Sequence, residues 1–236
     1  MKAFVIVVKD NPISEDGFNH LLESSHRVGN KFNIERFDAV TPDKVKNGIL
    51  KKHNLIWNYP WEKQVFDEST GLLKTPYKTK DKNLKIACAM SHYVLWKKCI
   101  ELNEPILILE HDSIWDKKLD VDLFMEVSKE KEIIGINSPL RATRNASIFL
   151  KNVAKNQLEI QSVPIVDEDN RIPQGLAGGS AYIIKSKGMQ KVLNAVNLYG
   201  LWHNDAFLCR QLFDDVLGVS KTFYTHVDAR LHSTTV

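Results

Sequence analysis

An apolar run, an amphipathic segment and an alternating segment follow one another over the first forty residues. Residues 3–8 are apolar without interruption, which predicts a buried strand. Residues 14–28 start with a serine and two acidic residues, carry apolar residues on one helical face and stop at a Gly-Asn pair, so they predict a helix. Residues 33–40 alternate apolar and polar positions and predict a second strand. This strand–helix–strand order predicts a right-handed parallel β-α-β unit, which is how the nucleotide-binding half of an α/β domain begins.

The periodicity is lost between residues 41 and 84, where prolines, glycines, aromatic residues and many lysines occur together. A loop of this length in a compact domain is usually functional. Its rings and lysines could stack on a sugar or a base and hold a phosphate, or they could cover the edge of the sheet. Helical spacing returns over residues 88–101, which include Ser91 and His92. For His92 a buried, hydrogen-bonded role is commoner than a catalytic one.

Residues 105–112 read Pro-Ile-Leu-Ile-Leu-Glu-His-Asp and form the most informative stretch. The apolar run predicts a buried strand of parallel type, and ligands in open α/β sheets collect beyond the carboxyl ends of such strands. Glu110 and Asp112 alternate along an extended chain, so both reach one face while His111 points away. Two carboxylates there could hold a hard divalent cation, or they could cap a helix or face solvent in a turn.

The second half of the chain predicts shorter elements. They are a helix at 121–127, a buried strand at 132–137, hairpin strands near 147–150 and 160–166, an amphipathic helix at 186–196, a helix over 206–213 and a last strand at 222–226. Gly178 and Gly179 precede a further apolar strand, where they could bring backbone N–H groups close to a ligand or make a tight turn. Asp205 could be a helix cap or a functional carboxylate at a helix start.

Composition narrows the class of protein without naming a partner. The 236 residues, of which 43% are hydrophobic, suffice for one α/β domain with a sizeable core. Lys and Arg number 32 against 29 Asp and Glu, a net charge of +3 that is too small for a dedicated nucleic-acid binder. No GxGxxG or GxxxxGK[ST] motif follows the first strand, which disfavours a dinucleotide fingerprint and a P-loop.

The cysteines and the apolar runs bear on the compartment. Three widely spaced cysteines without a CxxC motif suggest neither a disulfide framework nor a zinc site, and they favour a reducing compartment. No apolar run is long enough for a signal peptide or a membrane span. We therefore expect a cytoplasmic protein, and peripheral attachment to the inner face of a membrane stays open.

Two motifs about ten residues apart are distinctive in combination. Residues 87–96 read Ala-Cys-Ala-Met-Ser-His-Tyr-Val-Leu-Trp, and residues 106–112 read Ile-Leu-Ile-Leu-Glu-His-Asp. Together they resemble the core of the family 25 glycosyltransferases, the lipooligosaccharide-type sugar transferases related to the collagen galactosyltransferases. In that family a Gly-Cys-x-x-Ser-His helix precedes a strand ending in Glu-Asp-Asp. The resemblance extends to residues 34–40, to residues 178–184 and to Asp205.

The chain departs from the family pattern in two places. The central acidic residue of Glu-Asp-Asp is replaced by His111, which leaves the number of metal ligands open. The Arg-rich pattern usual after the first strand is replaced by Asn-Pro-Ile-Ser-Glu-Asp at residues 11–16, which leaves the nucleotide preference open.

The resemblance implies a GT-A-like α/β fold with a Rossmann-type, mostly parallel sheet flanked by helices. It implies one domain over residues 1–236, with a donor-binding part at about 1–135 and an acceptor-binding part at about 136–236. The donor is expected to be a nucleotide sugar, specifically a UDP-sugar. The acceptor is expected to be a hydroxyl group of a lipooligosaccharide, a lipopolysaccharide or another surface glycan.

The resemblance also implies roles for individual residues. Mn²⁺ or Mg²⁺ would be held by Asp112 and Glu110 with a late histidine, His226 or His232. Asp205 would be the base of an inverting transfer, and Glu110 would share in catalysis. Donor binding is expected at a larger set of residues: Val8, Asp38, Ala39, Ser91, His92, Gly178 and Gly179.

Three other functions compete with this one. The acceptor could be a hydroxylated base of viral DNA, for which the basic, aromatic segment at residues 44–85 is the only hint. The chain could be a non-catalytic relative that binds a nucleotide sugar or a glycan, because one acidic residue of the motif is lost. A phosphatase or nuclease using the same carboxylates is disfavoured because two-metal sites need more acidic residues.

Overall fold

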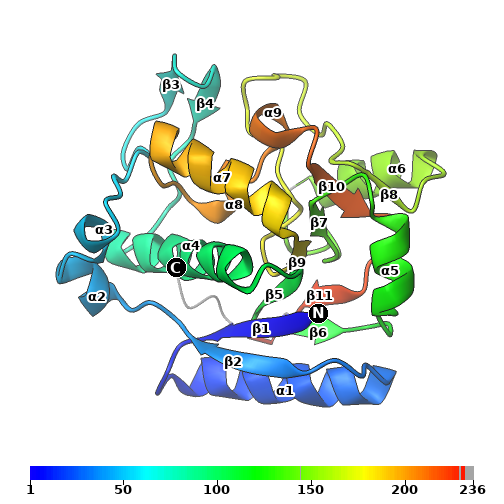
Figure 1. Cartoon of the computed structure of the whole chain (residues 1–236). Coiled ribbons are helices and arrows are strands. Elements are labelled where there is room, and N and C mark those ends of the chain that lie inside the picture. The colour runs from blue at the N-terminus through cyan, green and yellow to red at the C-terminus, as the bar shows by residue number, and fades with distance from the viewer. Residues whose placement is uncertain (144, 229, 232–236) are drawn as a thin grey trace.

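A seven-stranded sheet runs through the middle of the computed structural model, which describes residues 1–143, 145–228 and 230–231 (Figure 1). Its strands, in spatial order, are β2 (Ile34–Asp38), β1 (Lys2–Val7), β5 (Ile106–Glu110), β9 (Ala181–Ile184), β7 (Ile133–Gly135), β10 (Leu217–Ser220) and β8 (Ile160–Ser162). β9 and β8 are antiparallel to their neighbours, and the other five strands share one direction. The expected α/β class with a mostly parallel sheet is confirmed.

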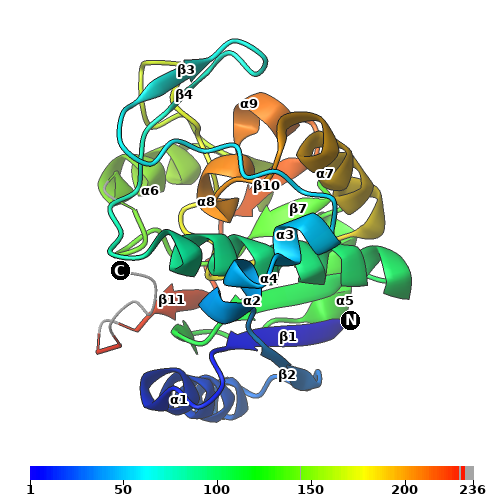
Figure 2. The ribbon, with the colours of Figure 1, turned by 90° about the vertical axis from the view of Figure 1, so that its left-hand side faces the viewer.

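Helices cover both faces of this sheet (Figures 1 and 2). One face carries α4 (Lys82–Leu102) and α7 (Ser186–Tyr199), and the other carries α1 (Pro12–Val28) and α5 (Val121–Val127). Neighbouring residues of β5 therefore enter different hydrophobic clusters, Ile108 on the α4 side and Leu109 on the α1 side. Burial on both sides is the reason that the central strands are continuous apolar runs.

The first strand, helix and strand form the parallel unit that the sequence predicts. β1 pairs in parallel with β2, with Val5 opposite Arg36. α1 begins after Asn11, whose side chain accepts a hydrogen bond from the backbone N–H of Ser14, and it ends at Gly29 with a φ of 80°. The Ser14 hydroxyl accepts a hydrogen bond from the backbone N–H of Val8, so the start of the helix fixes the end of β1.

The segment between β2 and α4 contains short elements that its sequence does not predict. They are α2 (Pro42–Lys46), α3 (Ile49–Lys52) and the hairpin of β3 (Val65–Asp67) and β4 (Leu72–Lys74). Lys74 is buried, pairs with Asp67 at 2.6 Å and lies 3.5 Å from the centre of the Trp202 ring. This buried cation ties the hairpin to the C-terminal half of the chain.

Two predictions of secondary structure are wrong, and one strand was missed. Residues 147–150 belong to α6 (Ala146–Lys155), because Phe149 and Val153 are buried at helical spacing. The single helix predicted over 206–213 is divided into α8 (Asn204–Phe207) and α9 (Arg210–Phe213). β10 was not predicted, because its four residues include a glycine and are too few to show a period.

The last strand pair leads the chain back to the acidic motif. β11 (Thr225–Val227) pairs antiparallel with β6 (Ser113–Trp115), which follows β5 directly. After β11, the backbone N–H of Asp228 donates to the carbonyl oxygen of Asp112 at 2.8 Å. Among the helices of the described residues, none combines the length and apolarity needed to cross a membrane.

Candidate active site

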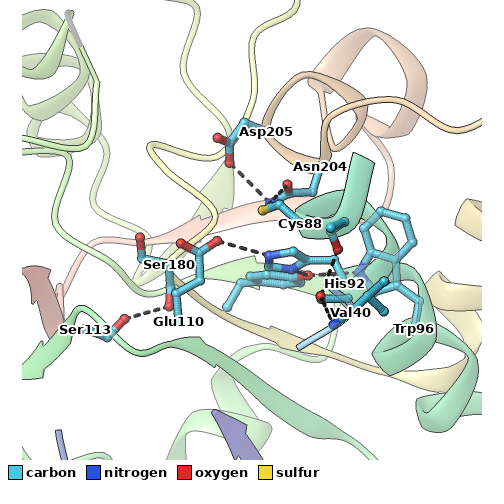
Figure 3. A network of polar contacts seen from close by, with 12 residues as sticks. Val40, Cys88, His92, Trp96, Glu110, Ser113, Ser180, Asn204 and Asp205 are labelled. Atoms are coloured by element: carbon cyan, nitrogen blue, oxygen red, sulfur yellow. Dashed lines mark hydrogen bonds and ion pairs between the residues drawn. The ribbon is translucent and has the colours of Figure 1, made fainter. Parts of the chain in front are cut away.

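A directed chain of buried hydrogen bonds ends at the carboxylate of Glu110 (Figure 3). The indole Nε1–H of Trp96 donates to the Tyr182 hydroxyl at 2.9 Å, and that hydroxyl lies 2.8 Å from Nδ1 of His92. The ionised carboxylate of Glu110 can only accept, so a neutral His92 ring donates to it from Nε2 and accepts at Nδ1 from the Tyr182 hydroxyl. The proton of the imidazole is then on Nε2, which lies 3.0 Å from Oε1 of Glu110. The chain thus fixes the orientation of the His92 ring and of the carboxylate.

This arrangement follows from the spacing of side chains on α4. Cys88, His92 and Trp96 are each four residues apart and share the helix face that meets β5 and β9. Ser91, on the adjacent position, accepts from the backbone N–H of Val40 at 2.9 Å and donates to the carbonyl of Ala87. The expected hydrogen-bonded role of His92 is confirmed, and the ring is fully buried.

Glu110 and Asp112 have opposite electrostatic environments. Burial alone would raise the pKa of Glu110, but the hydrogen bond from His92 brings that pKa below its ordinary value. Burial and then the charge of Glu110 raise the pKa of Asp112 to about 7. Oδ1 of Asp112 is buried and has no hydrogen-bond partner among the described residues. In the described part of the chain, burial and neighbouring carboxylates therefore disfavour the ionised form of Asp112, and one of its oxygens has no partner.

The predicted glycine turn lies against the predicted base. A Cβ atom on Gly179 would be 2.7 Å from Oδ1 of Asp205 and 2.4 Å from the amide nitrogen of Asn204, so any other residue there would displace these two side chains. Gly178 has a φ of 82°, a conformation that other residues rarely adopt. Although Asp205 is open to solvent on one side, the protein crowds its carboxylate, and this burial followed by the charge of Glu110 raises its pKa. Asp205 is not the helix cap, because α8 has His203 at that position.

A cavity of about 140 Å³ lies at the carboxyl ends of β1 and β5. The chain turns from β1 outward to β2 and later returns to β5 on the other side of β1, so this is the point where the strand order reverses. The predicted residues that line the cavity are Val8, Ala39, Ser91, His92 and Glu110. Asp38 is not among its lining residues, because its carboxylate pairs on the surface with Arg36 at 2.7 Å.

A larger groove of about 600 Å³ lies on the other side of Asp205. Its walls include Tyr59, Tyr77, Lys78 and Lys85 from the segment before and at the start of α4, together with Asp205 itself. Asp205 and Glu110 also interact electrostatically, so Asp205 is the residue that connects the groove with the carboxylates of the cavity.

The predicted histidine ligands do not join this cluster in the described residues. His226 lies opposite Ile114 in the β11–β6 pair, and its Nδ1 is 2.8 Å from Oδ2 of Asp116. His232 lies outside the described residues. His111 is buried against α1, since a Cβ on Gly17 would be 2.6 Å from its carbonyl oxygen. Packing, which the sequence predicts for His111, is only part of its position, because His111 also lines the cavity at the carboxyl ends of β1 and β5.

Cys88, Tyr182 and Asn204 are site residues that the sequence did not single out. Sγ of Cys88 is 3.9 Å from Oδ1 of Asn204, next to Glu110 and Asp205 (Figure 3). Two signals were available for Cys88: its place in the Cys-x-x-Ser-His motif and the four-residue spacing of Cys88, His92 and Trp96. Tyr182 had no local signal, because its contact with His92 joins positions 90 residues apart.

Comparisons with known proteins place the chain in a family. The model of glycosyltransferase family 25, described as an LPS biosynthesis protein, matches residues 1–207. No curated protein matches the chain. Among solved structures, galactosyltransferase LgtC in complex with donor and acceptor sugar analogues has a TM-score of 0.48 and 7% identity over 97% of this chain and 87% of that chain. Mouse xyloside xylosyltransferase 1, in its apo form, has a TM-score of 0.45 and 11% identity over 93% of this chain and 85% of that chain.

The family match begins at the first residue and extends through the hydrogen-bonded chain, the acidic motif, the glycine turn and Asp205. It spans far more than half of the 236 residues. The chain therefore belongs to glycosyltransferase family 25, the LPS biosynthesis type, and is a glycosyltransferase.

Proposed function

We propose that this glycosyltransferase moves a sugar from a UDP-sugar to a hydroxyl group of a lipooligosaccharide, a lipopolysaccharide or another surface glycan, with Mn²⁺ or Mg²⁺ as cofactor. The observation that carries the proposal is the grouping of three carboxylates. Glu110 lines the small cavity, Asp205 lines the larger groove, and Asp112 interacts electrostatically with both. The donor occupies the cavity and the acceptor occupies the groove. The two substrates then meet at the carboxylates.

The carboxylates fit a hard divalent cation. Asp112 offers a buried oxygen without a partner among the described residues, and burial followed by the charge of Glu110 raises its pKa. Carboxylate oxygens are the ligands that Mg²⁺ and Mn²⁺ prefer. Asp112 would hold the cation, with Glu110 through the oxygen that His92 leaves free. The cation would neutralise charge on the diphosphate leaving group.

Asp205 is the proposed base of an inverting transfer. Its carboxylate lines the acceptor groove and is held by the glycine turn, so a hydroxyl group in the groove comes within hydrogen-bond reach. The raised pKa of Asp205 improves its capacity to take the proton as the hydroxyl attacks the donor sugar.

The walls of the groove suit a charged glycan. Tyr59 and Tyr77 offer ring faces for stacking on a sugar, and Lys78 and Lys85 offer positive charge. Lipopolysaccharide is an acceptor of this kind, and we propose that the enzyme acts in the cytoplasm with peripheral contact to the inner face of the membrane.

The test combines binding and transfer with single carboxylate variants. A panel of UDP-sugars with Mn²⁺, Mg²⁺ or EDTA is screened by thermal shift, since a ligand of the native state raises the melting temperature. The best donor is then used for transfer to truncated lipooligosaccharide acceptors. We expect Asp112→Asn to lose metal-dependent donor binding, and Asp205→Asn to bind the donor but lose at least about 100-fold in kcat.

Asp214→Asn is the matched control, because the Asp214 side chain forms an ion pair with Arg210 at 3.0 Å on the surface. It should bind and transfer as the unaltered enzyme does. Donor binding that is indifferent to metal would refute the cation site. Full transfer by Asp205→Asn would remove Asp205 from the mechanism.

A further inference from the structure

We propose that Cys88, His92 and Glu110 form a second cation site, for a thiophilic metal such as Zn²⁺, and that occupation of this site shuts off the enzyme. The proposed inhibition rests on the proposed function, because it assumes that the donor occupies the cavity. The metal site itself does not depend on that assumption. The sequence gives no hint of it, since the cysteines form no CxxC motif.

The three side chains have the reach that a zinc site needs. Cys88 and His92 are one turn apart on α4 and face the carboxyl end of β5, where Glu110 lies (Figure 3). One ligand atom from each lies within 4.8 Å of the other two, and Nε2 of His92 is 3.0 Å from Oε1 of Glu110. Tetrahedral Zn²⁺ bonds of about 2.0–2.3 Å place the ligand atoms about 3–4 Å apart. Small side-chain rotations would therefore complete the site.

The surroundings of His92 support metal ligation. A ligating histidine normally uses its second ring nitrogen in a hydrogen bond that fixes the ring, and Nδ1 of His92 has this bond with Tyr182 at 2.8 Å. On binding, the Cys88 thiol releases its proton to solvent, and the imidazole proton moves from Nε2 to Nδ1. The Tyr182 oxygen then accepts from Nδ1, and the thiolate and the Glu110 carboxylate balance the two charges of the metal.

The proposed zinc site differs in chemistry from the proposed Mn²⁺ or Mg²⁺ site, although both use Glu110. Thiolate and imidazole favour Zn²⁺, whereas Asp112 offers the oxygen that hard cations prefer. Cys88, His92 and Glu110 all line the donor cavity, so a cation enters from it. A bound Zn²⁺ would take Glu110 from the carboxylate cluster and occupy space in a cavity of only about 140 Å³. Donor and Zn²⁺ should therefore exclude one another.

The decisive measurement is the absorption spectrum of the full-length, metal-stripped protein titrated with Co²⁺, which reports a thiolate ligand by a charge-transfer band. We expect the band at one equivalent of Co²⁺, its displacement by Zn²⁺, and its loss in Cys88→Ser. The same substitution should weaken Zn²⁺ binding, measured against a chromophoric chelator, at least tenfold, because even an outer-shell change costs about 10–100-fold. Cys209→Ala is the control; Cys209 is buried away from the cavity lining and should keep the band.

The metal site is overturned if the wild-type protein lacks the charge-transfer band. It is also overturned if Cys88→Ser melts normally and binds Zn²⁺ with unchanged affinity. Glu110→Gln gives a second test, since it keeps the thiol and should weaken Zn²⁺ binding while the band remains. Inhibition is measured separately, as the Zn²⁺ concentration that halves Mn²⁺-dependent transfer. If Zn²⁺ inhibits wild type and Cys88→Ser equally, the proposed inhibition is wrong but the metal site is not affected. If the enzyme shows no transfer at all, the proposed function is contradicted, and the Co²⁺ spectrum still tests the metal site.

Discussion

Replacing a proposed metal ligand should make the metal-free protein more stable. In Asp112→Asn the carboxylate disappears while the shape of the side chain is kept. The folded pKa of Asp112 is about 7 against an ordinary value of 3.8, so the folded state binds this proton more tightly than the unfolded chain does. The stability that the group contributes is present below about pH 4 and is lost as the pH rises through about 7.

The size of the effect follows from the shift. About three pKa units at 1.36 kcal/mol each correspond to about 4 kcal/mol at neutral pH. Asp112 is partly exposed, and solvent screening reduces this figure, so we expect Asp112→Asn to gain about 2 kcal/mol in free energy of unfolding at about pH 8. At about pH 4 the gain should vanish, because the wild-type carboxyl is then protonated in the folded state.

The assay is urea unfolding in EDTA at both pH values, with Asp214→Asn as the control. The control loses only a surface ion pair and should change by less than about 1 kcal/mol. Added Mn²⁺ should stabilise the wild type and leave Asp112→Asn unchanged, which reverses their order. A variant that is no more stable than wild type at about pH 8 in EDTA would refute the uncompensated charge on which the cation site is argued.

Three further outcomes test the rest of the site. Tyr182→Phe leaves two buried ring nitrogens without their shared partner and should lower the free energy of unfolding by about 2–5 kcal/mol in urea; an unchanged value would show that water replaces the hydroxyl. Gly179→Ala places a methyl group 2.7 Å from Oδ1 of Asp205, so kcat should fall about 100-fold at unchanged donor affinity. An unaltered kcat would show that the glycine turn has no role in catalysis. The Kd of Mn²⁺, measured by calorimetry, should rise roughly 100-fold from about pH 8 to about pH 5, because protons compete for a carboxyl with a pKa of about 7; a pH-independent Kd would exclude Asp112 as a ligand.

Much of the fold could be predicted because burial leaves a local signature. β1, β5 and β7 are apolar on both faces, and α1, α4 and α7 repeat apolar residues at helical spacing. The elements that were missed or predicted wrongly are those in which the apolar pattern spans only a few residues. Four residues of β10 and the strand-like start of α6 each hold too few positions to separate a period of two from one of 3.6.

The site was predictable where its residues are neighbours in sequence. Glu110 and Asp112 lie at and just after the end of one strand, and Ser91 and His92 share one helix. The motifs at residues 106–112 and 87–96 therefore predicted them. His226 was chosen only for its late position in the chain. The register of β11 on β6 sets it opposite Ile114, where its Nδ1 lies 2.8 Å from Oδ2 of Asp116. Register between distant strands is a tertiary property, and no local pattern of residues specifies it.

The direction of β9 decides how this site is assembled. Because β9 is antiparallel to β5, its amino end and not its carboxyl end lies at the ligand-binding edge, where Ser180 accepts from the backbone N–H of Glu110 at 2.8 Å. The Gly178–Gly179 turn is thereby placed beside the carboxylates, and Tyr182, one residue into the strand, reaches His92. A parallel β9 would present Ile184 at that edge and leave both the base and the histidine unsupported. One reversed strand thus couples the packing of the sheet to the chemistry at its edge, and a substitution that weakens β9 should lower stability and transfer together.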